Sequence, residues 1–434
     1  MLKGQFPVEK FASLRTPFYY YDLPLLRRTL DKIRECIEPY PQFHVHYAVK
    51  ANFNGRILQE ISRCGFGADC VSGGEVRAAL QNGFAPESIV YAGVGKSDEE
   101  ILLALDAGIA RFNVESAAEL EVINELALSR GVVAPVSLRV NPDIGAHTHA
   151  NITTGLAENK FGINYEQLPG VIELADSLPG VEYKGLHFHI GSQILEMDDF
   201  VALCNRINVL AEQILRQRRG RLVPAASSAA AVGYSSSAVG AAGVSGSGAA
   251  AGSGVAAGVA GVAGAAASVL GDINVGGGLG INYYHPNHLD VAEFSQYFET
   301  FARHLKLPEG TPVHFELGRS VVAPCGSLIS RVLYIKEGTT RRFAIIDASM
   351  TELIRPALYK AYHRVENISS YEPEEVYDVV GPVCESSDVF AKGVSIDKCH
   401  RGDFIAIRSA GAYGESMSSQ YNCRPLPACF FKED

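Results

Sequence analysis

The sequence predicts a (β/α)8 barrel followed by a second, mostly β domain. The first observation is a regular alternation of short apolar runs and helical stretches between about residues 43 and 319. The second is that eight such runs occur, the number that closes a parallel barrel. The third is a change beyond residue 321, where strand-like runs follow one another with few helical stretches. An open, doubly wound sheet is the alternative, but no glycine-rich turn follows the first strand.

The predicted elements follow in order. The eight barrel strands are HVHYAVKAN, GADCVS, SIVYAGV, RFNVES, VSLRVNP, VEYKGLHFHIGS, INVGGGLGI and VHFELGRS. The β domain is predicted from SLISRVLYIKEG, RRFAIIDAS, EEVYDVVGP and DFIAIRSAG, and the N-terminal TPFYYYD is a further strand that could join it. The predicted division is therefore residues 1–26 as an N-terminal strand of the β domain, 27–321 as the barrel and 322–434 as the C-terminal β domain.

Residues 222–271 fit neither pattern, because they carry no charge and consist almost entirely of Ala, Gly, Ser and Val. A membrane helix is disfavoured, since the Leu, Ile and Phe that drive insertion are almost missing. We expect a flexible, low-complexity insertion. Because it falls between a helix and the next strand, it should leave the barrel from the N-terminal face, away from the end where barrel active sites lie.

Composition narrows the class of protein. The 434 residues suffice for a large core and two domains. A formal net charge of −10 argues against nucleic acid or an anionic membrane as partner. The first residues carry charges and prolines where a signal peptide needs an apolar run. Nine cysteines without a CxxC pair fit a reducing cytoplasm and argue against a disulfide framework or a zinc site. We expect a cytoplasmic protein without a metal.

Chemically capable side chains gather at the C-terminal ends of the predicted strands, where barrel active sites lie. They are Lys50, Asp69, Arg139, Asn141, His189, Ser192, the glycines at 276–278 and residues 316–319. Most strand-end lysines only cap a loop. A lysine that is partly desolvated at such an end, however, has a lowered pKa and becomes an amine nucleophile.

Four features together predict a site for pyridoxal phosphate (PLP). The run GGGLG offers backbone N–H groups to an anion without a Cβ in the way, and HIGS adds a hydroxyl. His189 could lie flat against an aromatic ring, and Glu316 could keep a pyridine nitrogen protonated. Taken singly, the glycines could serve a tight turn and His189 could be a barrel histidine with no ligand. Combined with Lys50, they point to the cofactor.

The chain resembles the fold-type III PLP-dependent decarboxylases, most closely the diaminopimelate decarboxylases. The segments that carry the resemblance are HYAVKAN, GADCVSGGE, HFHIGSQ, NVGGGLG, ELGRS, LIRPALY, GPVCESSD and GAYG, of which LIRPALY and GPVCESSD are the most specific. It extends from about residue 18 to residue 424 without the low-complexity insertion, and it implies a PLP-binding barrel with a C-terminal β domain. Leu317 stands where the family usually has proline, and Ser349 where it usually has glycine.

The resemblance implies a role for each matching residue. Lys50 would bind PLP covalently, and Cys384 would donate the proton. The other cofactor-binding residues it implies are Asp69, His189, Ser192, Gly277, Gly278, Glu316, Gly318, Arg319 and Tyr413. The substrate-binding residues it implies are Arg319, Arg355, Tyr359, Glu385 and Tyr413. In the family the segment with Cys384 and Glu385 completes the site of the other subunit, so a homodimer with shared active sites is implied.

The implied reaction is decarboxylation of meso-2,6-diaminopimelate to L-lysine and CO2, the last step of lysine biosynthesis. Arginine binds a carboxylate through two parallel hydrogen bonds. Arg319 and Arg355 therefore suit a substrate with two carboxylates, and Glu385 suits its distal ammonium group.

Three other functions are compatible with parts of this pattern. A sister enzyme acting on arginine, ornithine or carboxynorspermidine would leave Arg355 without a carboxylate to bind. A non-catalytic PLP-binding regulatory protein should have lost Lys50, Cys384 or the glycine run, and all are present. An alanine racemase is disfavoured by Glu316, because an arginine at the ring nitrogen would favour racemisation.

Overall fold

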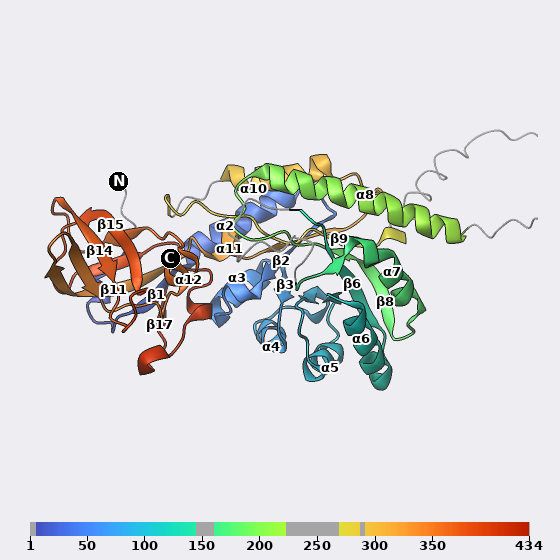
Figure 1. Cartoon of the computed structure of the whole chain (residues 1–434), viewed down its shortest axis with the longest axis horizontal. Coiled ribbons are helices and arrows are strands. Elements are labelled where there is room, and N and C mark those ends of the chain that lie inside the picture. Colours follow the sequence, from blue (N-terminus) through green and yellow to red (C-terminus); the bar gives the residue numbers. More distant parts are fainter. Residues whose placement is uncertain (1–5, 145–159, 223–268, 287–290, 434) are drawn as a thin grey trace, which may run out of the picture.

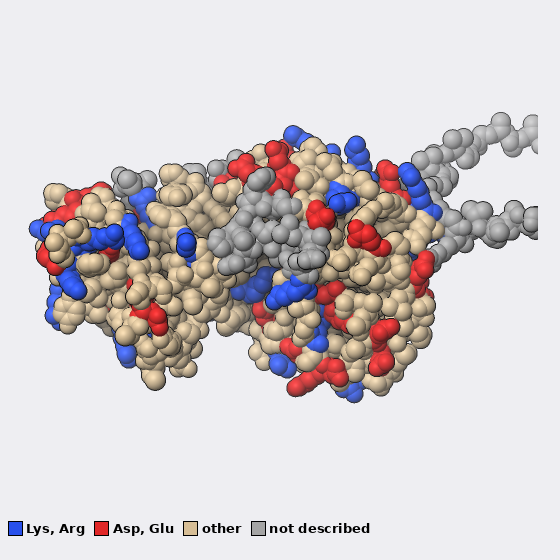
Figure 2. Space-filling view, in the orientation of Figure 1, with Lys and Arg blue, Asp and Glu red and all other residues tan. Residues whose placement is uncertain are grey.

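The computed structural model describes residues 6–144, 160–222, 269–286 and 291–433. These residues form a barrel and a smaller β domain, which lie side by side in Figure 1. On the face shown in Figure 2, acidic and basic side chains are interspersed over both parts. Most of the predicted insertion, residues 223–268, lies outside the described residues. Within the described part of the chain, no helix has both the length and the apolar character needed to cross a membrane.

Eight parallel strands close into the barrel. In the order of their pairing they are β2 (Phe43–Ala48), β3 (Gly67–Cys70), β4 (Ile89–Tyr91), β5 (Arg111–Val114), β6 (Ala134–Asn141), β8 (Val181–His187), β9 (Asp272–Asn274) and β10 (Val313–Leu317). The barrel closes where β10 pairs with β2, with Val313 opposite Phe43. The short strand β7 (Ile163–Asn164) pairs with β6. Each predicted strand is present, so the barrel is confirmed and the open sheet is ruled out.

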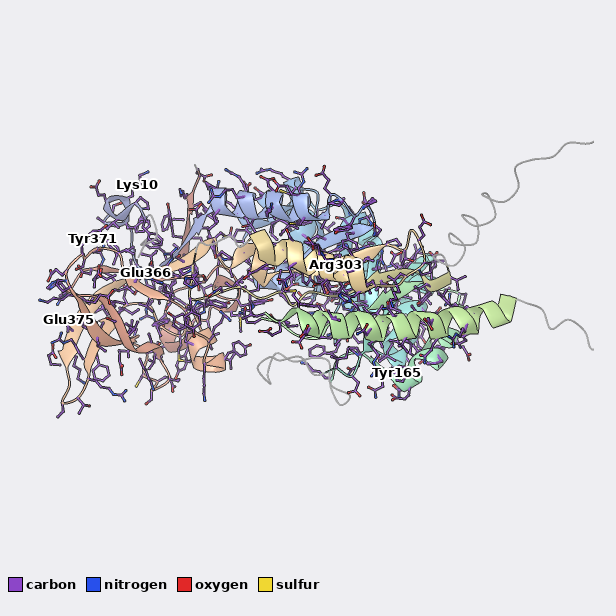
Figure 3. All side chains as sticks on the ribbon, turned by 90° about the horizontal axis from the view of Figure 1, so that it is seen from above. Lys10, Tyr165, Arg303, Glu366, Tyr371 and Glu375 are labelled. Atoms are coloured by element: carbon purple, nitrogen blue, oxygen red, sulfur yellow. The ribbon has the colours of Figure 1, made fainter. Side chains whose placement is uncertain are left out.

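Helices cover the outside of the barrel (Figure 1). They are α2 (Leu23–Ile37), α3 (Gly55–Arg63), α4 (Gly73–Gln81), α5 (Asp98–Ala107), α6 (Ala117–Arg130), α7 (Leu168–Ser177), α8 (Met197–Leu222) and α10 (Val291–His304). The short helix α11 (Arg319–Val322) follows β10 and is buried. Three of the covering helices begin at a serine whose hydroxyl accepts a backbone N–H of the first turn, namely Ser72, Ser97 and Ser116. Figure 3 shows α8 alongside α10, which carries Arg303.

The β domain combines both ends of the chain in one mixed sheet. Its strands are β1 (Phe18–Asp22), β11 (Gly326–Glu337), β12 (Arg342–Ile346), β13 (Val365–Asn367), β14 (Glu374–Val380), β15 (Val389–Asp397), β16 (Phe404–Ile407) and β17 (Ala428–Lys432), and its helices are α1 (Val8–Phe11) and α12 (Arg355–Tyr359). Strand β1 pairs antiparallel with β11 and parallel with β17. The prediction that the N-terminal strand joins this domain is therefore confirmed. Strands β13, β15 and β17 are not among the strands predicted from the sequence.

Strand β10 shows how the alternation of side chains builds both the core and the site. Its outward residue Phe315 is fully buried and lies in an aromatic cluster with Phe43 of β2 and Phe298 and Phe301 of α10, at centroid distances of 4.9, 5.0 and 5.2 Å. These contacts fix the strand against the helix layer. Its neighbours in sequence then face the barrel interior.

The barrel interior is polar on one side. Strands β5, β9 and β10 each contribute two polar residues spaced two apart, Arg111 and Asn113, Asp272 and Asn274, and His314 and Glu316. The first member of each pair belongs to a lower layer, in which Asp272 binds Arg111 at 2.7 Å and His314 at 3.2 Å. The second member belongs to an upper layer nearer the C-terminal ends of the strands, where the two asparagines hydrogen-bond to Glu316.

Candidate active site

A cavity of about 990 Å³ lies at the C-terminal ends of the barrel strands. Its lining includes Lys50, Asp69, Arg139, His187, His189, Ser192, Tyr283, Glu316, Arg319, Arg355, Tyr359 and Tyr413. The barrel supplies most of these residues, while Arg355, Tyr359 and Tyr413 come from the segment after β12. The cavity is therefore built by both domains, and the structure brings together most of the residues that the sequence singled out.

Lys50 lies in a single turn of 3-10 helix, Val49–Ala51, directly after β2 rather than within the strand. Its Nζ lies 3.6 Å from Oδ2 of the fully buried Asp69. Burial is the largest single influence on Lys50 and would lower its pKa, but the surrounding acidic groups, Asp69 foremost, together outweigh burial and raise the pKa. Burial in turn raises the pKa of Asp69, and the ammonium of Lys50 opposes that rise. The two groups therefore lie within ion-pairing distance of each other, and an electrophile must displace this pairing to reach the amine.

Glu316 is held in its anionic form. Burial would raise its pKa, but His187, whose Nε2 lies 3.1 Å from Oε2, and the charge of Lys50 outweigh burial and lower the pKa. The other oxygen, Oε1, accepts hydrogen bonds from Nδ2 of Asn274 at 2.8 Å and from Nδ2 of Asn113 at 3.4 Å. A carboxylate has about four lone-pair positions. Three are used inside the barrel, which leaves one for a donor in the cavity.

Asn274 links this acid to the glycine run. While its Nδ2 donates to Glu316, its Oδ1 accepts the backbone N–H of Gly276 at 2.8 Å. The backbone N–H of Glu316 also donates to the carbonyl of Gly276 at 2.8 Å. Sequence reasoning missed Asn274, Asn113 and His187. The available signal was a polar side chain next to a recognised motif, as in NVGGGLG and HFHIGS.

The glycine run is joined to the HIGS loop by backbone pairing. Ile194 donates to the carbonyl of Gly278, and Gly280 donates back to Ile194, both at 2.9 Å. A Cβ on Gly277 would lie 1.8 Å from the carbonyl oxygen of Glu316, so only glycine fits. Gly277 and Gly278 themselves do not line the cavity, whereas residues 279–284 do. The run therefore acts through its backbone and its close approach to β10.

His189 lines the cavity between these loops and accepts the backbone N–H of Gly277 on Nδ1 at 3.3 Å. Burial and the nearby charge of Lys50 lower the pKa of His189 well below its ordinary value, so the ring is neutral. A neutral imidazole can lie against an aromatic ring without bringing a charge next to it.

Cys384 and Glu385 lie outside this cavity. Both are exposed, and neither lines the cavity of its own chain. The backbone N–H of Cys384 donates to Oδ1 of Asn422 at 3.3 Å, and the hydroxyl of Tyr421 donates to Glu385 at 2.7 Å. These two residues therefore form a surface patch, separate from the lysine of the same chain.

The residues of the cavity fit PLP. Lys50 offers the amine, and Glu316 offers one free carboxylate position for a protonated ring nitrogen. Apart from the Lys50 pairing, neither oxygen of the buried Asp69 has a hydrogen-bond partner among the described residues, so a cofactor near Lys50 would meet an unused acceptor. Across those residues, no group of three or more His, Cys, Asp or Glu side chains is arranged to hold a metal ion.

Comparison with known proteins shows the family to which the chain belongs. A family model described as pyridoxal-dependent decarboxylase, pyridoxal binding domain, matches residues 26–218. The diaminopimelate decarboxylase of Bacteroides thetaiotaomicron is 53% identical over 433 residues, which cover 100% of both chains. The chain belongs to the diaminopimelate decarboxylase family. The family member from Zymomonas mobilis is 36% identical over 96% of this chain and 87% of its own.

Solved structures of the family agree. Diaminopimelate decarboxylase from Helicobacter pylori, complexed with L-lysine, superposes with a TM-score of 0.80 at 34% identity, covering 98% of this chain and 94% of that one. The diaminopimelate decarboxylase from M. jannaschii, in co-complex with L-lysine, gives 0.78 at 31% identity, covering 98% and 89%. The resemblance seen in the sequence is thereby confirmed.

The two departures from the family pattern are accommodated locally. Ser349 is fully buried, and its hydroxyl and backbone N–H bind Oε2 of Glu352 at 2.9 and 2.7 Å, which closes the turn before LIRPALY. Leu317 ends β10 with its side chain fully buried in the core. Neither substitution removes a polar group from the cavity.

Proposed function

We propose that this chain decarboxylates meso-2,6-diaminopimelate to L-lysine and CO2, with PLP bound at Lys50, as the last step of lysine biosynthesis in the cytoplasm. The observation that carries the proposal is a single cavity that holds a lysine, an anionic Glu316 and two guanidinium groups, Arg319 and Arg355. The first two suit the cofactor, and the guanidiniums suit a substrate with a second carboxylate.

When bound, PLP supplies the electron sink for the electrons left behind by CO2. Glu316 would accept the hydrogen bond of the ring N–H and keep the proton there, because its pKa is lowered and its other lone pairs are taken. The neutral imidazole of His189 would lie against the cofactor ring. The remaining residues that would hold the cofactor are Asp69, Ser192, Gly277, Gly278, Gly318, Arg319 and Tyr413. Arg319 is itself fixed, with its guanidinium 4.8 Å from the ring centroid of Tyr413 and its Nη2 2.9 Å from Oγ of Ser192.

On the substrate side, we assign Arg319, Arg355, Tyr359 and Tyr413 to one chain and Glu385, with the proton donor Cys384, to the other chain of a homodimer. The support for sharing is that the patch with Cys384 and Glu385 is exposed and lies outside its own chain's cavity. An exposed thiol is also accessible to a partner's site. The homodimer would therefore have two active sites, each completed by the other subunit.

A parallel assay tests the activity. The purified holoenzyme is given meso-diaminopimelate, L-lysine, L-ornithine or L-arginine, and released CO2 and product amines are measured. We expect turnover of meso-diaminopimelate at a kcat/KM at least about a hundredfold above the others, since a receptor left with unpaired polar groups rejects the analogue that lacks the matching group. Preferred turnover of ornithine or arginine would identify a sister decarboxylase, and no turnover at all would identify a non-catalytic PLP-binding protein.

Asn274→Leu should weaken PLP binding. The change removes the 2.8 Å hydrogen bond to Glu316 and leaves the buried N–H of Gly276 without its acceptor, a loss of about 1–3 kcal/mol. We therefore expect the Kd for PLP, titrated spectroscopically into apoenzyme, to rise about tenfold or more. Asn113→Leu is the matched control, because it removes only a 3.4 Å contact to the same oxygen. Equal and small effects of the two changes would show that Asn274 does not position the cofactor site.

A further inference from the structure

Two buried cations in the cavity lack an acidic partner within the described part of the chain. Arg319 and Arg355 are 6% and 5% exposed, yet neither forms an ion pair within the residues that the structure describes. Buried charges in proteins are normally paired, because an unpaired charge in a low-dielectric site is costly. The other buried arginines, Arg139 and Arg408, each bind a glutamate at 2.7 Å. We therefore expect the anion that completes Arg319 and Arg355 to come from a ligand.

The hydroxyl of Tyr283 joins the two guanidiniums. It accepts a hydrogen bond from Nη1 of Arg319 at 2.8 Å and from Nη1 of Arg355 at 2.9 Å. A phenol oxygen has one proton and two acceptor positions. Both acceptor positions are used by the arginines, so the proton must be directed to a third group. Tyr283 lines the cavity, which makes this proton available to a ligand there.

His363 fixes Arg355 from the other side. Its Nδ1 donates to the carbonyl of Arg408 at 2.9 Å, and its Nε2 lies 2.8 Å from Nη1 of Arg355. Burial and the charge of Arg355 lower the pKa of His363 to about 3, so the ring stays neutral and Nε2 stays an acceptor. Both protons of Nη1 of Arg355 are then used, one by His363 and one by Tyr283. The edge formed by Nε and Nη2 has no hydrogen-bond partner among the described residues and is left for the ligand.

We infer that Tyr283 is a substrate-binding residue that donates its proton to the carboxylate retained in the product, and that His363 is a positioning residue for Arg355. This inference rests on the proposed function, because the retained carboxylate is the one that meso-diaminopimelate and L-lysine share. The receptor then comprises two guanidiniums at a separation fixed by one phenol oxygen, plus the phenol proton. This receptor binds a planar carboxylate, and it gains no hydrogen bond from a ligand such as an alkyl amine that lacks the carboxylate.

The phosphate of PLP is the competing anion in the same cavity. A receptor for the substrate carboxylate predicts that changes at Tyr283 alter the affinity for L-lysine. A receptor for phosphate predicts that they alter the affinity for PLP. L-lysine and cadaverine form a matched ligand pair for this comparison, since they differ only by the carboxylate in question.

The experiment measures Ki values for L-lysine and for cadaverine, and the Kd for PLP, in wild type and in Tyr283→Phe holoenzyme. We expect Tyr283→Phe to raise the Ki of L-lysine and the KM of meso-diaminopimelate by about tenfold or more, as for loss of a hydrogen bond to a charged group. The Ki of cadaverine, the Kd of PLP and kcat should each change less than about threefold. Tyr297→Phe is the matched control, because the buried hydroxyl of Tyr297 has no partner among the described residues.

His363 is tested by a pair of variants. His363→Leu leaves Nη1 of Arg355 without its acceptor and should reproduce the loss of L-lysine affinity, while His363→Gln offers a side-chain carbonyl and should recover most of it. A rise in the Kd of PLP with unchanged Ki for L-lysine would overturn the inference in favour of phosphate. Unchanged L-lysine affinity in Tyr283→Phe would overturn it outright. If wild type does not act on meso-diaminopimelate at all, the proposed function itself has failed.

Discussion

Lys50→Ala should abolish decarboxylation, and borohydride should fix the cofactor on Lys50 in the wild-type enzyme. Among the described residues, Lys50 is the lysine that lines the cavity, and Asp69, at 3.6 Å, is the acidic group that pairs with its ammonium. An amine with this freedom can exchange its ion pair for a covalent bond to the aldehyde of PLP. The measurement is peptide mapping after reduction, together with CO2 release by the variant.

Lys96, whose side chain is buried, provides the internal control. Nζ of Lys96 donates to Glu119 at 2.6 Å and to the carbonyls of Gly93 and Asn113 at 2.8 and 2.9 Å. All three of its protons are used, so it should remain unlabelled although it lies near the same strand ends. Label on Lys96, or on any lysine other than Lys50, would refute the assignment. Turnover by Lys50→Ala close to that of wild type would also refute the assignment.

Cys384→Ala should lose most turnover while it retains PLP and binds L-lysine. General acid catalysis contributes typically about 10²- to 10⁴-fold, which sets the expected loss in kcat. The thiol is exposed and lies outside its own chain's cavity, so its removal should not disturb the cofactor. The measurement is kcat alongside the absorbance of bound PLP. Cys423→Ala is the matched control, since Cys423 is also an exposed cysteine in the neighbouring segment.

Mixing Cys384→Ala with Lys50→Ala tests whether the site is shared. In a mixed dimer, one site would contain both Lys50 and Cys384, and the other would contain neither. With random subunit exchange, about half of the dimers are mixed and each has one working site of two, so activity should approach roughly a quarter of wild type. If exchange is demonstrated and the mixture stays as inactive as its components, Cys384 does not act across a subunit boundary.

The barrel was predictable because its signal is local. Each strand coincides with a short apolar run, and several of the following helices begin at a capping residue, such as Ser97 with Glu100. The rule that barrel sites lie at strand C-termini then placed Lys50 and Glu316 in one cavity without any knowledge of distances. Family motifs supplied Arg355 and Cys384, which no periodicity could have marked.

The residues that the sequence did not reveal depend on partners far away in the chain. His187 meets Glu316 across 129 positions, and Arg319 meets Tyr283 across 36. A histidine such as His363, read alone, is indistinguishable from any buried histidine. Its significance comes from two hydrogen bonds that only the folded chain brings about.

The two polar layers inside the barrel restrict how this protein can change over evolutionary time. An apolar core accepts one substitution at a time, because neighbouring side chains can shift to fill the altered volume. Hydrogen bonds in a buried network are directional, so loss of one side chain leaves a buried polar group without a hydrogen-bond partner. Asp272, for instance, serves both Arg111 and His314, so a change at any one of the three needs a compensating change at another. We therefore expect residues of the lower polar layer to be substituted together during evolution. Phe315 and its aromatic neighbours on the outer side of the barrel can be substituted one at a time.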